Sequence, residues 1–118
     1  MTTTVTLEDL VEIESIKQVR YLYSHYYDGN RLDDLVSLFT EDAVCEFGEG
    51  FGGNWVGKAH IRERYHDFLY GSGREVHSQM HAVTNPWIRI LSDEEAYGRW
   101  YQLNLNVAEG AENPLTLF

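Results

Sequence analysis

Hydrophobic positions near the start of the chain recur every three or four residues, which is the period of an amphipathic helix. This pattern extends from Leu7 to Tyr27, and Thr6 followed by Asp9 is a helix-capping pattern. The sequence therefore predicts one helix of about five or six turns, ended by Asp28-Gly29-Asn30. A shorter helix should follow, with an inner face made of Leu32, Leu35, Val36, Leu38 and Phe39.

The rest of the chain alternates between strand and helix patterns before it becomes wholly strand-like. Short strands are predicted at 43–47 and 54–56, with four glycines between them in 48–53 as a turn or hairpin, and a third helix at 57–70. Long strands are then predicted at 74–84, 86–91 and 95–108, and the segment 92–94 makes a tight turn between the last two.

This order of elements predicts the fold class. Helices come first and a meander of long strands follows, which is typical of an α+β protein with helices packed on one face of a curved antiparallel sheet. With 118 residues, the chain should form a single domain, 1–118, around one core. The segment 113–118 resembles a strand that is just starting. A sheet that curls around a helix needs more strands than these, so we expect the chain to be truncated at its C-terminus.

Composition and charge narrow the partners. The formal net charge is -10, so neither nucleic acid nor an anionic membrane surface should attract the chain. Cys45 is the single cysteine, which excludes an intrachain disulfide, and its strand-like surroundings predict a buried thiol. The polar N-terminus resembles no signal peptide and no transmembrane run is visible, so we expect a cytoplasmic protein.

Two histidines, His77 and His81, lie four residues apart in a strand-like segment. On a helix this spacing would place both on one face and could bind zinc. On a strand they also share a face but lie roughly 13 Å apart, too far for one metal ion. Strand composition favours the second interpretation, so no metal site is expected. A histidine in such a place is often a satisfied core residue.

The strand predicted at 95–108 has two different faces. One carries Trp100 followed by three amides, Gln102, Asn104 and Asn106, while the other carries mainly tyrosines and leucines. Buried amides need hydrogen-bond partners, which a cavity with a polar ligand or water would supply. The alternative is that the amide face is exposed to solvent and the other face is the core.

A carboxylate at the end of the first helix gives His81 a different possible role. Asp28 could orient the imidazole, and a carboxylate–histidine pair is a general-base device for proton abstraction. Tyr23 and Tyr27 both precede Asp28, four residues apart on nearly one helix face, and either phenol could donate to a developing oxyanion. The residues alone do not choose between these two tyrosines.

Several short motifs resemble the SnoaL-like branch of the nuclear transport factor 2-like superfamily, in order and over nearly the whole chain. They are Tyr23-x-x-x-x-Asp28-Gly29, Leu35-x-x-Leu38-Phe39-Thr40-x-Asp42-Ala43-Val44, Gly57-x-x-x-Ile61, His81-Ala82-Val83-Thr84-Asn85-Pro86 and Ala96-x-Gly98-Arg99-Trp100-Tyr101. The resemblance implies a cone: a strongly curved antiparallel sheet wrapped around N-terminal helices, the NTF2-like or cystatin-like α+β barrel, with a deep apolar pocket.

The resemblance also implies a chemistry, through the dehydratase-type members (the scytalone dehydratase, bile acid 7α-dehydratase and lindane dehydrochlorinase types). In these, an Asp and a His form a dyad, which Asp28 and His81 match, and Tyr23 matches a catalytic tyrosine. Substrate-binding positions would be Tyr27, Cys45, Phe47, Trp55, Gln79, Trp100, Gln102 and Asn104. One departure is that the chain stops before the late strand that carries a pocket arginine in several relatives.

The sequence therefore predicts a cofactor-independent lyase that eliminates water from a small hydroxylated cyclic or polyketide-like substrate in an internal pocket. A polyketide cyclase or isomerase with the same base is one alternative, because only the fate of the carbanion differs. A non-catalytic small-molecule-binding or assembly module is another. Exposed aromatics on the sheet, with Trp87, Tyr97 and Tyr101 as candidates, suggest a homo-oligomer, a dimer or trimer.

Overall fold

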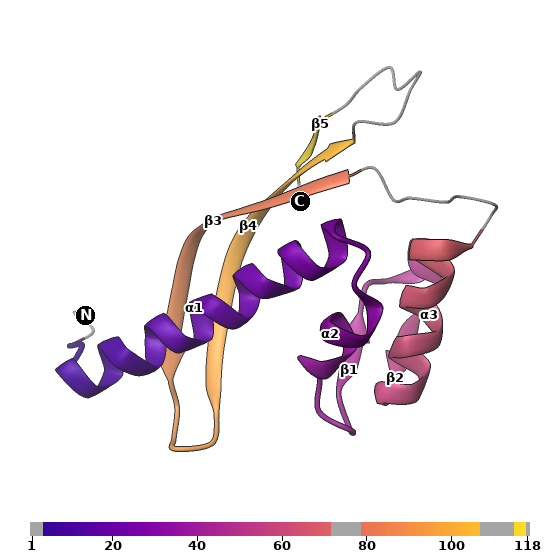
Figure 1. The fold of residues 1–118 in the computed structure, drawn as a ribbon. Coiled ribbons are helices and arrows are strands. Elements are labelled where there is room, and N and C mark those ends of the chain that lie inside the picture. The colour runs from indigo at the N-terminus through magenta and orange to yellow at the C-terminus, as the bar shows by residue number, and fades with distance from the viewer. Residues whose placement is uncertain (1–3, 72–78, 107–114, 118) are drawn as a thin grey trace. The chain divides into compact units, whose positions relative to one another are not determined.

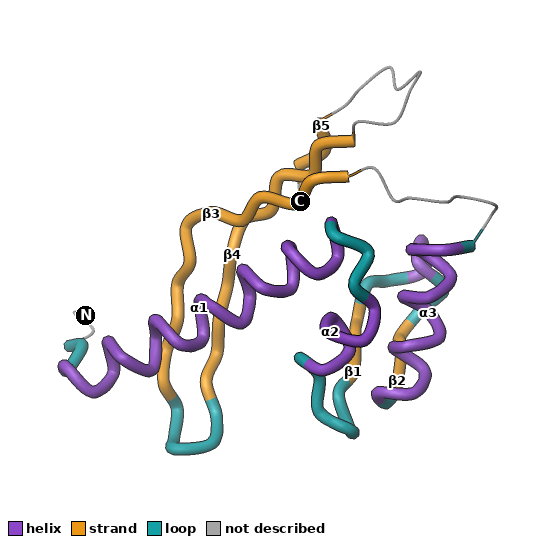
Figure 2. Tube along the Cα trace, viewed as in Figure 1, coloured by secondary structure: helices purple, strands orange, loops and turns teal. Residues whose placement is uncertain are grey.

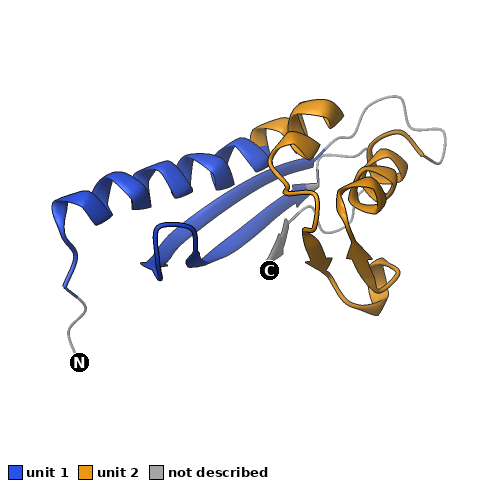
Figure 3. Cartoon of the chain, turned by 90° about the horizontal axis from the view of Figure 1, so that it is seen from below, with its two compact units in different colours: residues 1–24, 79–118 blue, residues 25–78 orange. Residues whose placement is uncertain are grey.

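The computed structural model describes residues 4–71, 79–106 and 115–117, and they form two compact units. Unit 1 combines residues 1–24 with 79–118, and unit 2 comprises residues 25–78. Figure 3 shows unit 1 in blue and unit 2 in orange. The expected α+β class is confirmed, because helices and antiparallel strands occur in the predicted order (Figures 1 and 2).

The first helix, α1, spans Leu7–Asp28, as the apolar period predicts. The backbone N–H of Asp9 donates to Thr6 Oγ1 at 3.1 Å, and that of Thr6 donates to a carboxylate oxygen of Asp9 at 3.4 Å. This reciprocal pair is a capping box. At the other end, the N–H of Arg31 donates to the carbonyl of Tyr26, and Asn30 adopts a positive φ of 57°, so the helix stops where expected.

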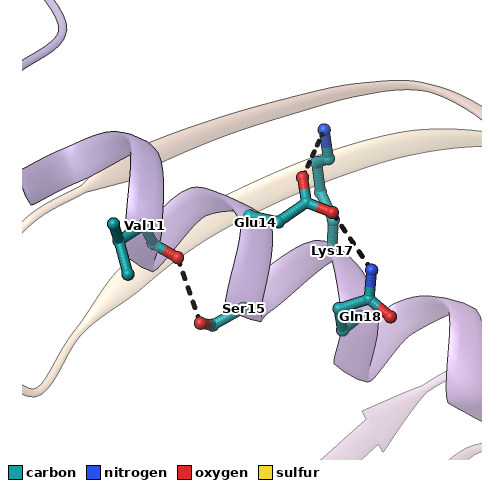
Figure 4. A network of polar contacts seen from close by, with 5 residues as sticks. All are labelled: Val11, Glu14, Ser15, Lys17 and Gln18. Carbon is teal, nitrogen blue, oxygen red and sulfur yellow. Dashed lines mark hydrogen bonds and ion pairs between the residues drawn. The ribbon is translucent and has the colours of Figure 1, made fainter. Parts of the chain in front are cut away.

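One side of α1 carries a network of polar contacts, shown in Figure 4. Glu14 accepts a hydrogen bond from Gln18 and an ion-pair contact from Lys17 at 3.1 Å, while Ser15 Oγ donates to the carbonyl of Val11. The hydrogen bond from Gln18, followed by the contact with Lys17, lowers the pKa of the Glu14 carboxyl. Because Glu14, Ser15 and Gln18 are exposed, this side of α1 is a solvated face.

Unit 2 contains the tightly packed core. Helices α2, Leu32–Ser37, and α3, Lys58–Tyr70, belong to it together with a two-stranded hairpin of β1, Val44–Glu46, and β2, Asn54–Val56. A short 3-10 turn, Glu49–Phe51, closes the hairpin at the predicted glycines. The buried apolar residues are Tyr27, Leu32, Leu35, Val36, Cys45, Trp55, Ile61, Tyr65 and Leu69. The expected inner face of α2 is therefore largely confirmed.

Unit 1 is built on a long antiparallel hairpin of β3, Gln79–Ile90, and β4, Ala96–Asn106, with β5, Leu115–Leu117, paired on the far side of β4. The start of a strand expected at 113–118 is confirmed for 115–117. The turn at 92–94 is confirmed, because Ser92 Oγ accepts from the N–H groups of Glu94 and Glu95.

The predicted division of the first long strands was wrong. Instead of separate strands at 74–84 and 86–91, β3 is one strand with a register shift between Thr84 and Trp87. Residues 74–78 lie outside the described part of the chain. Asn85 has a positive φ of 54°, so the Asn85-Pro86 pair forms a β-bulge rather than a strand end. Pro86 lacks an N–H, and a bulge is one of the few places where a sheet accepts proline.

The described strands form two separate sheets, and within them no closed or curled sheet is present. The hairpin of unit 1 changes direction along its length, as Figure 1 shows. The cone-shaped sheet implied by the resemblance is therefore supported only at the level of an α+β fold with N-terminal helices and antiparallel strands. The described helices include none that is long and apolar enough to cross a membrane.

Candidate active site

The candidate site is one face of the β3–β4 hairpin. His81 pairs with Asn104 across the ladder, and Val83 pairs with Gln102, so these four side chains share a face. His81, Val83, Gln102 and Asn104 are half-buried, whereas Met80 and Ala82 on the opposite face are exposed. The strand interpretation of the histidine segment is therefore correct for His81. His77 lies outside the described residues.

Burial along β4 differs between the two parts of the strand. Trp100, like Gln102 and Asn104, is half-buried, while the neighbouring residues Tyr97, Arg99 and Tyr101 are exposed. On the opposite face Leu103 and Leu105 are half-buried as well, so the two faces differ in exposure over 97–101 and are covered alike over 102–105. The choice between the two interpretations therefore stays a prediction. Gln79 begins β3 opposite Asn106 and is also half-buried.

Helix α1 supplies a cation to this face. Arg20 Nη2 donates to Gln102 Oε1 at 2.5 Å, and Arg20 Nη1 donates to Ser24 Oγ at 3.0 Å. The same guanidinium lies over the ring of Tyr23, 4.7 Å from its centroid, a cation–π distance. In Figures 1 and 3, α1 extends along the hairpin, and the Arg20–Gln102 bond shows that it lies on the polar face.

Arg20 was not among the predicted site residues, because the helix was predicted from apolar positions alone. A signal was nevertheless present. Ile13, Ile16, Arg20, Tyr23 and Tyr27 are spaced by three or four residues, so Arg20 falls on the inward stripe of α1. A charged residue at such a position needs a partner, and Gln102 and Ser24 provide hydrogen-bond acceptors.

Two polar atoms on the site face are buried with no hydrogen-bond partner among the described residues: Trp100 Nε1 and Asn104 Oδ1. The indole ring of Trp100 lies over Gly98, where an added Cβ would come within 2.3 Å of Trp100 Cη2. Gly98 therefore gives the indole its place on the sheet. Such unsatisfied buried atoms are uncommon in native proteins and frequently mark a function.

Other predicted site residues lie in unit 2. Asp28 is half-buried at the last position of α1. Tyr27 is only 8% exposed, with its ring edge-on to that of Tyr65 at 5.9 Å, so Tyr27 contributes to core packing. Because Asp28 belongs to unit 2 and His81 to unit 1, the predicted dyad stays a prediction.

The remaining predicted lining residues, Cys45, Phe47 and Trp55, also lie in unit 2. Trp55 is 2% exposed, and its ring contacts those of Phe47 and Tyr65 at 4.7 and 5.1 Å between centroids. Its Nε1 donates to the carbonyl of Phe51. Cys45 pairs with Trp55 in the small hairpin and is buried, and this burial raises the pKa of its thiol. Within unit 2, the three residues therefore belong to a hairpin with an aromatic core, and their contact with substrate stays a prediction.

A metal centre finds no support in the described segments, which hold no group of three or more His, Cys, Asp or Glu side chains suited to a metal ion.

Comparison with known proteins identifies the scaffold. The sequence profile of the SnoaL-like domain matches residues 8–117. A structure from Novosphingobium aromaticivorans, provisionally assigned as a scytalone dehydratase, is 23% identical with a TM-score of 0.75, and the match covers 92% of this chain and 68% of that one. An NTF2-like protein with a cystatin-like fold, also from N. aromaticivorans, is 16% identical with a TM-score of 0.64 over 98% of this chain and 75% of that one.

A third structure from the same organism, provisionally assigned as an aromatic ring hydroxylase, is 26% identical with a TM-score of 0.67. This match covers 90% of the present chain and 70% of the other. These three structures share one fold but carry different functional assignments. The likeness therefore establishes the architecture of this chain and leaves its reaction open.

Proposed function

Because the chain belongs to the SnoaL-like domain family, we propose that it is a cofactor-independent lyase of the dehydratase type. Its substrate would be a small hydroxylated cyclic or polyketide-like compound. The observation that supports this most directly is the polar face of unit 1, where the half-buried His81 lies opposite Asn104 and beside the amide of Gln102. A neutral imidazole on a partly covered face is suited to remove a proton.

In this proposal, His81 takes a proton from the carbon next to an activating carbonyl group. The released electron pair forms the carbon–carbon double bond, and the hydroxyl on the following carbon leaves as water with the proton that the imidazolium returns. Asp28 accepts a hydrogen bond from the other ring nitrogen, fixes the tautomer and stabilises the imidazolium. Tyr23 donates to the oxygen that gains charge. Arg20 lies over the Tyr23 ring. A positive charge close to the phenol helps the phenol to stabilise negative charge on that oxygen.

The proposal includes a surrounding pocket lined by Tyr27, Cys45, Phe47, Trp55, Gln79, Trp100, Gln102 and Asn104, inside a cone-shaped sheet. The bulge at Asn85 supports this shape, because bulges bend strands and increase local twist. The likeness to a cystatin-like fold at a TM-score of 0.64 supports it as well. A crystal structure with bound product would test both the shape and the lining.

Turnover is tested with a panel of hydroxylated cyclic ketones in deuterated water. Mass spectrometry would detect loss of water, and NMR would detect deuterium at the carbon next to the carbonyl. We expect His81→Ala and Asp28→Asn each to lower the rate by roughly 100-fold or more, the range of general-base catalysis. His66→Ala is the matched control, since that histidine is exposed on α3, and it should keep the parent rate.

The other outcomes separate the alternatives. A product of unchanged mass would replace the dehydratase with an isomerase or cyclase. Binding without turnover in the parent protein would favour a non-catalytic binding module. If Asp28→Asn turned over at the parent rate, the dyad would be wrong. The His81→Ala rate would then decide whether His81 is the base in a different arrangement.

We also propose self-association through the outer face of the unit 1 hairpin. Trp87, Tyr97 and Tyr101 are exposed there, and the Trp87 and Tyr97 rings meet edge to face at 5.9 Å. Exposed aromatic patches are typical of protein interfaces. Light scattering should give the mass of a dimer or trimer, and Trp87→Ala combined with Tyr101→Ala should lower it to that of a monomer.

A further inference from the structure

Arg64 on α3 differs from the other described lysines and arginines of unit 2 in having no acidic partner. The others form ion pairs: Arg31 with Asp34, Lys58 with Glu41 and Arg62 with Asp33. Arg64 is half-buried, and no carboxylate of the described residues lies within ion-pair distance of it. A partly buried charge is usually paired, because its removal from water costs free energy. A counter-ion for Arg64 would therefore have to come from outside the described residues.

The hydrogen bonds of Arg64 leave one donor unused. Its Nη2 donates to the backbone carbonyl of Phe51 at 2.9 Å, whereas its Nε is buried and has no partner among the described residues. In the planar guanidinium group, the Nε–H and one Nη2–H are parallel, and this edge matches the two oxygens of a carboxylate. The single carbonyl oxygen of Phe51 satisfies one of these two donors. A carboxylate in its place would accept from both and would supply the missing negative charge.

Phe51 occupies this place as a bound aromatic molecule would. Its carbonyl accepts a second hydrogen bond, from Trp55 Nε1 at 3.0 Å, so two donors of unit 2 converge on one oxygen. Its ring centroid lies 5.9 Å from that of Phe47 and 6.0 Å from that of Phe68. The Arg64 guanidinium lies 5.5 Å from the centroid of the Trp55 ring and 5.8 Å from that of Phe68. The surroundings of Phe51 thus combine aromatic side chains with a cation.

The turn that carries Phe51 has a hinge at each end. The turn, Glu49–Phe51, lies between β1 and β2 (Figure 1), and it is flanked by Gly48 with a φ of 85° and Gly52 with a φ of 87°. Glycine adopts many backbone conformations at little cost, so both positions allow the turn to move. Phe51 is itself 41% exposed. Movement of the turn would release Arg64 and Trp55 from the Phe51 carbonyl.

We propose that Arg64 binds the carboxylate of a small aromatic acid at a site within unit 2, and that Phe51 closes this site when no ligand is bound. The carboxylate pairs with Nε and Nη2 of Arg64, and one of its oxygens also accepts from Trp55 Nε1. The ligand ring takes the place of the Phe51 ring against Phe47 and Phe68. Although Phe47 and Trp55 also belong to the pocket lining proposed above, binding at Arg64 does not depend on lyase activity.

The covalent structure of Phe51 defines a suitable ligand. Its Cβ and Cα atoms separate the ring from the carbonyl carbon, and 3-phenylpropanoate has the same spacing between its ring and its carboxylate. The corresponding amide, 3-phenylpropanamide, has the same shape without the charge, and it offers a single carbonyl oxygen, as Phe51 does. A comparison of these two compounds therefore isolates the contribution of the second oxygen and the charge.

Dissociation constants of both compounds are measured by calorimetry on the full chain. The parent should bind the acid at least about 10-fold more tightly than the amide, the effect of a hydrogen bond to a charged group. Arg64→Gln should lose this preference. Arg64→Lys, which keeps the charge without the paired donors, should retain only part of it. Arg62→Gln is the matched control for net charge, since Arg62 is exposed on the same helix, and it should keep the parent's preference.

A further variant tests the role of the turn. Phe51→Ala should bind 3-phenylpropanoate more tightly than the parent does, because no protein ring then competes with the ligand ring. Unchanged or weaker binding by Phe51→Ala would overturn the proposal, since the turn would then be a fixed part of unit 2. Absence of binding by both the parent and Phe51→Ala would overturn it as well.

Equal binding of the acid and the amide by the parent would also overturn the proposal, and so would an unchanged preference in Arg64→Gln. The comparison of the two compounds in the parent needs no variant, so it is decisive even if Arg64→Gln does not fold. Neither compound carries a hydroxyl group that could be eliminated. Absence of lyase activity would therefore leave these constants unchanged, and the two proposals can fail separately.

Discussion

At the scale of single residues, Gly98 decides where the Trp100 indole lies. A Cβ at position 98 would come within 2.3 Å of one indole carbon and within 2.6 Å of another, so Gly98→Ala must displace the ring. We expect a stability loss of about 1–3 kcal/mol, typical of overpacking, and a shift in tryptophan emission. Gly50→Ala is the matched control, because a Cβ there meets no atom within 4 Å. Unchanged emission in the Gly98 variant would contradict this role.

The buried thiol of Cys45 gives a prediction about pH. Burial raises the pKa of this thiol, so the unfolded chain ionises before the folded one. The corresponding stability is present below the unfolded pKa, about 8.5, and is lost as the pH rises through the folded pKa. The urea midpoint of the parent should therefore fall more between pH 8 and pH 10 than that of Cys45→Ala. Parallel curves for the two proteins would contradict it.

The residue scale also shows where sequence patterns fail. The strand period correctly placed Gln102 and Asn104 on one face of their strand, because alternation is a local property of the backbone. Their pairing with Val83 and His81 follows from the register of β3 and β4. Arg20 was missed because its partner Gln102 is 82 residues away in the chain. The position of the Trp100 ring over Gly98 depends on rotamer and packing, which no spacing rule encodes.

At the scale of elements, the bulge in β3 depends on the backbone conformation of Asn85. Its φ of 54° lies in the left-handed region, which asparagine tolerates and β-branched residues do not. Asn85→Val should lower the free energy of unfolding by about 1–3 kcal/mol, whereas Asn85→Gly should change it little. Chemical denaturation of the two variants checks this, and equal stability would argue against the left-handed conformation.

The same bulge explains the main error in the predicted elements. An Asn-Pro pair normally favours a turn, so two strands were expected where β3 is continuous. The pairing of Trp87 with Arg99 and of Ile88 with Gly98 extends the ladder beyond the bulge. Local turn signals were thus outweighed by cross-strand pairing. Helix α1, by contrast, begins at a capping box of neighbouring residues, Thr6 and Asp9, so its boundaries were predicted nearly to the residue. The bounds of α3 also differ by only one residue from those expected.

At the scale of the whole molecule, the stabilising core is unevenly distributed. Every buried apolar residue among those whose burial is described lies in unit 2, whereas Leu10 and Val11 on α1 are more than half exposed. Ile61→Ala should therefore cost about 2–5 kcal/mol through loss of apolar contact and the remaining cavity. Val11→Ala should stay within about 0.5 kcal/mol of the parent. Urea unfolding followed by circular dichroism would measure both, and similar losses would contradict this distribution.

The extra residue in β3 has a consequence for how the chain can change in length. Between Thr84 and Trp87 there are two residues on β3 and one on β4, so removal of Asn85 would preserve the recorded pairs on both sides. An insertion or deletion between His81 and Thr84 would instead reverse the side from which the imidazole projects. Deletion of one residue at the bulge would therefore keep the pairing of the site face, whereas a deletion a few residues earlier would turn the imidazole to the other face. The side on which His81 lies thus depends on the number of residues between it and the bulge.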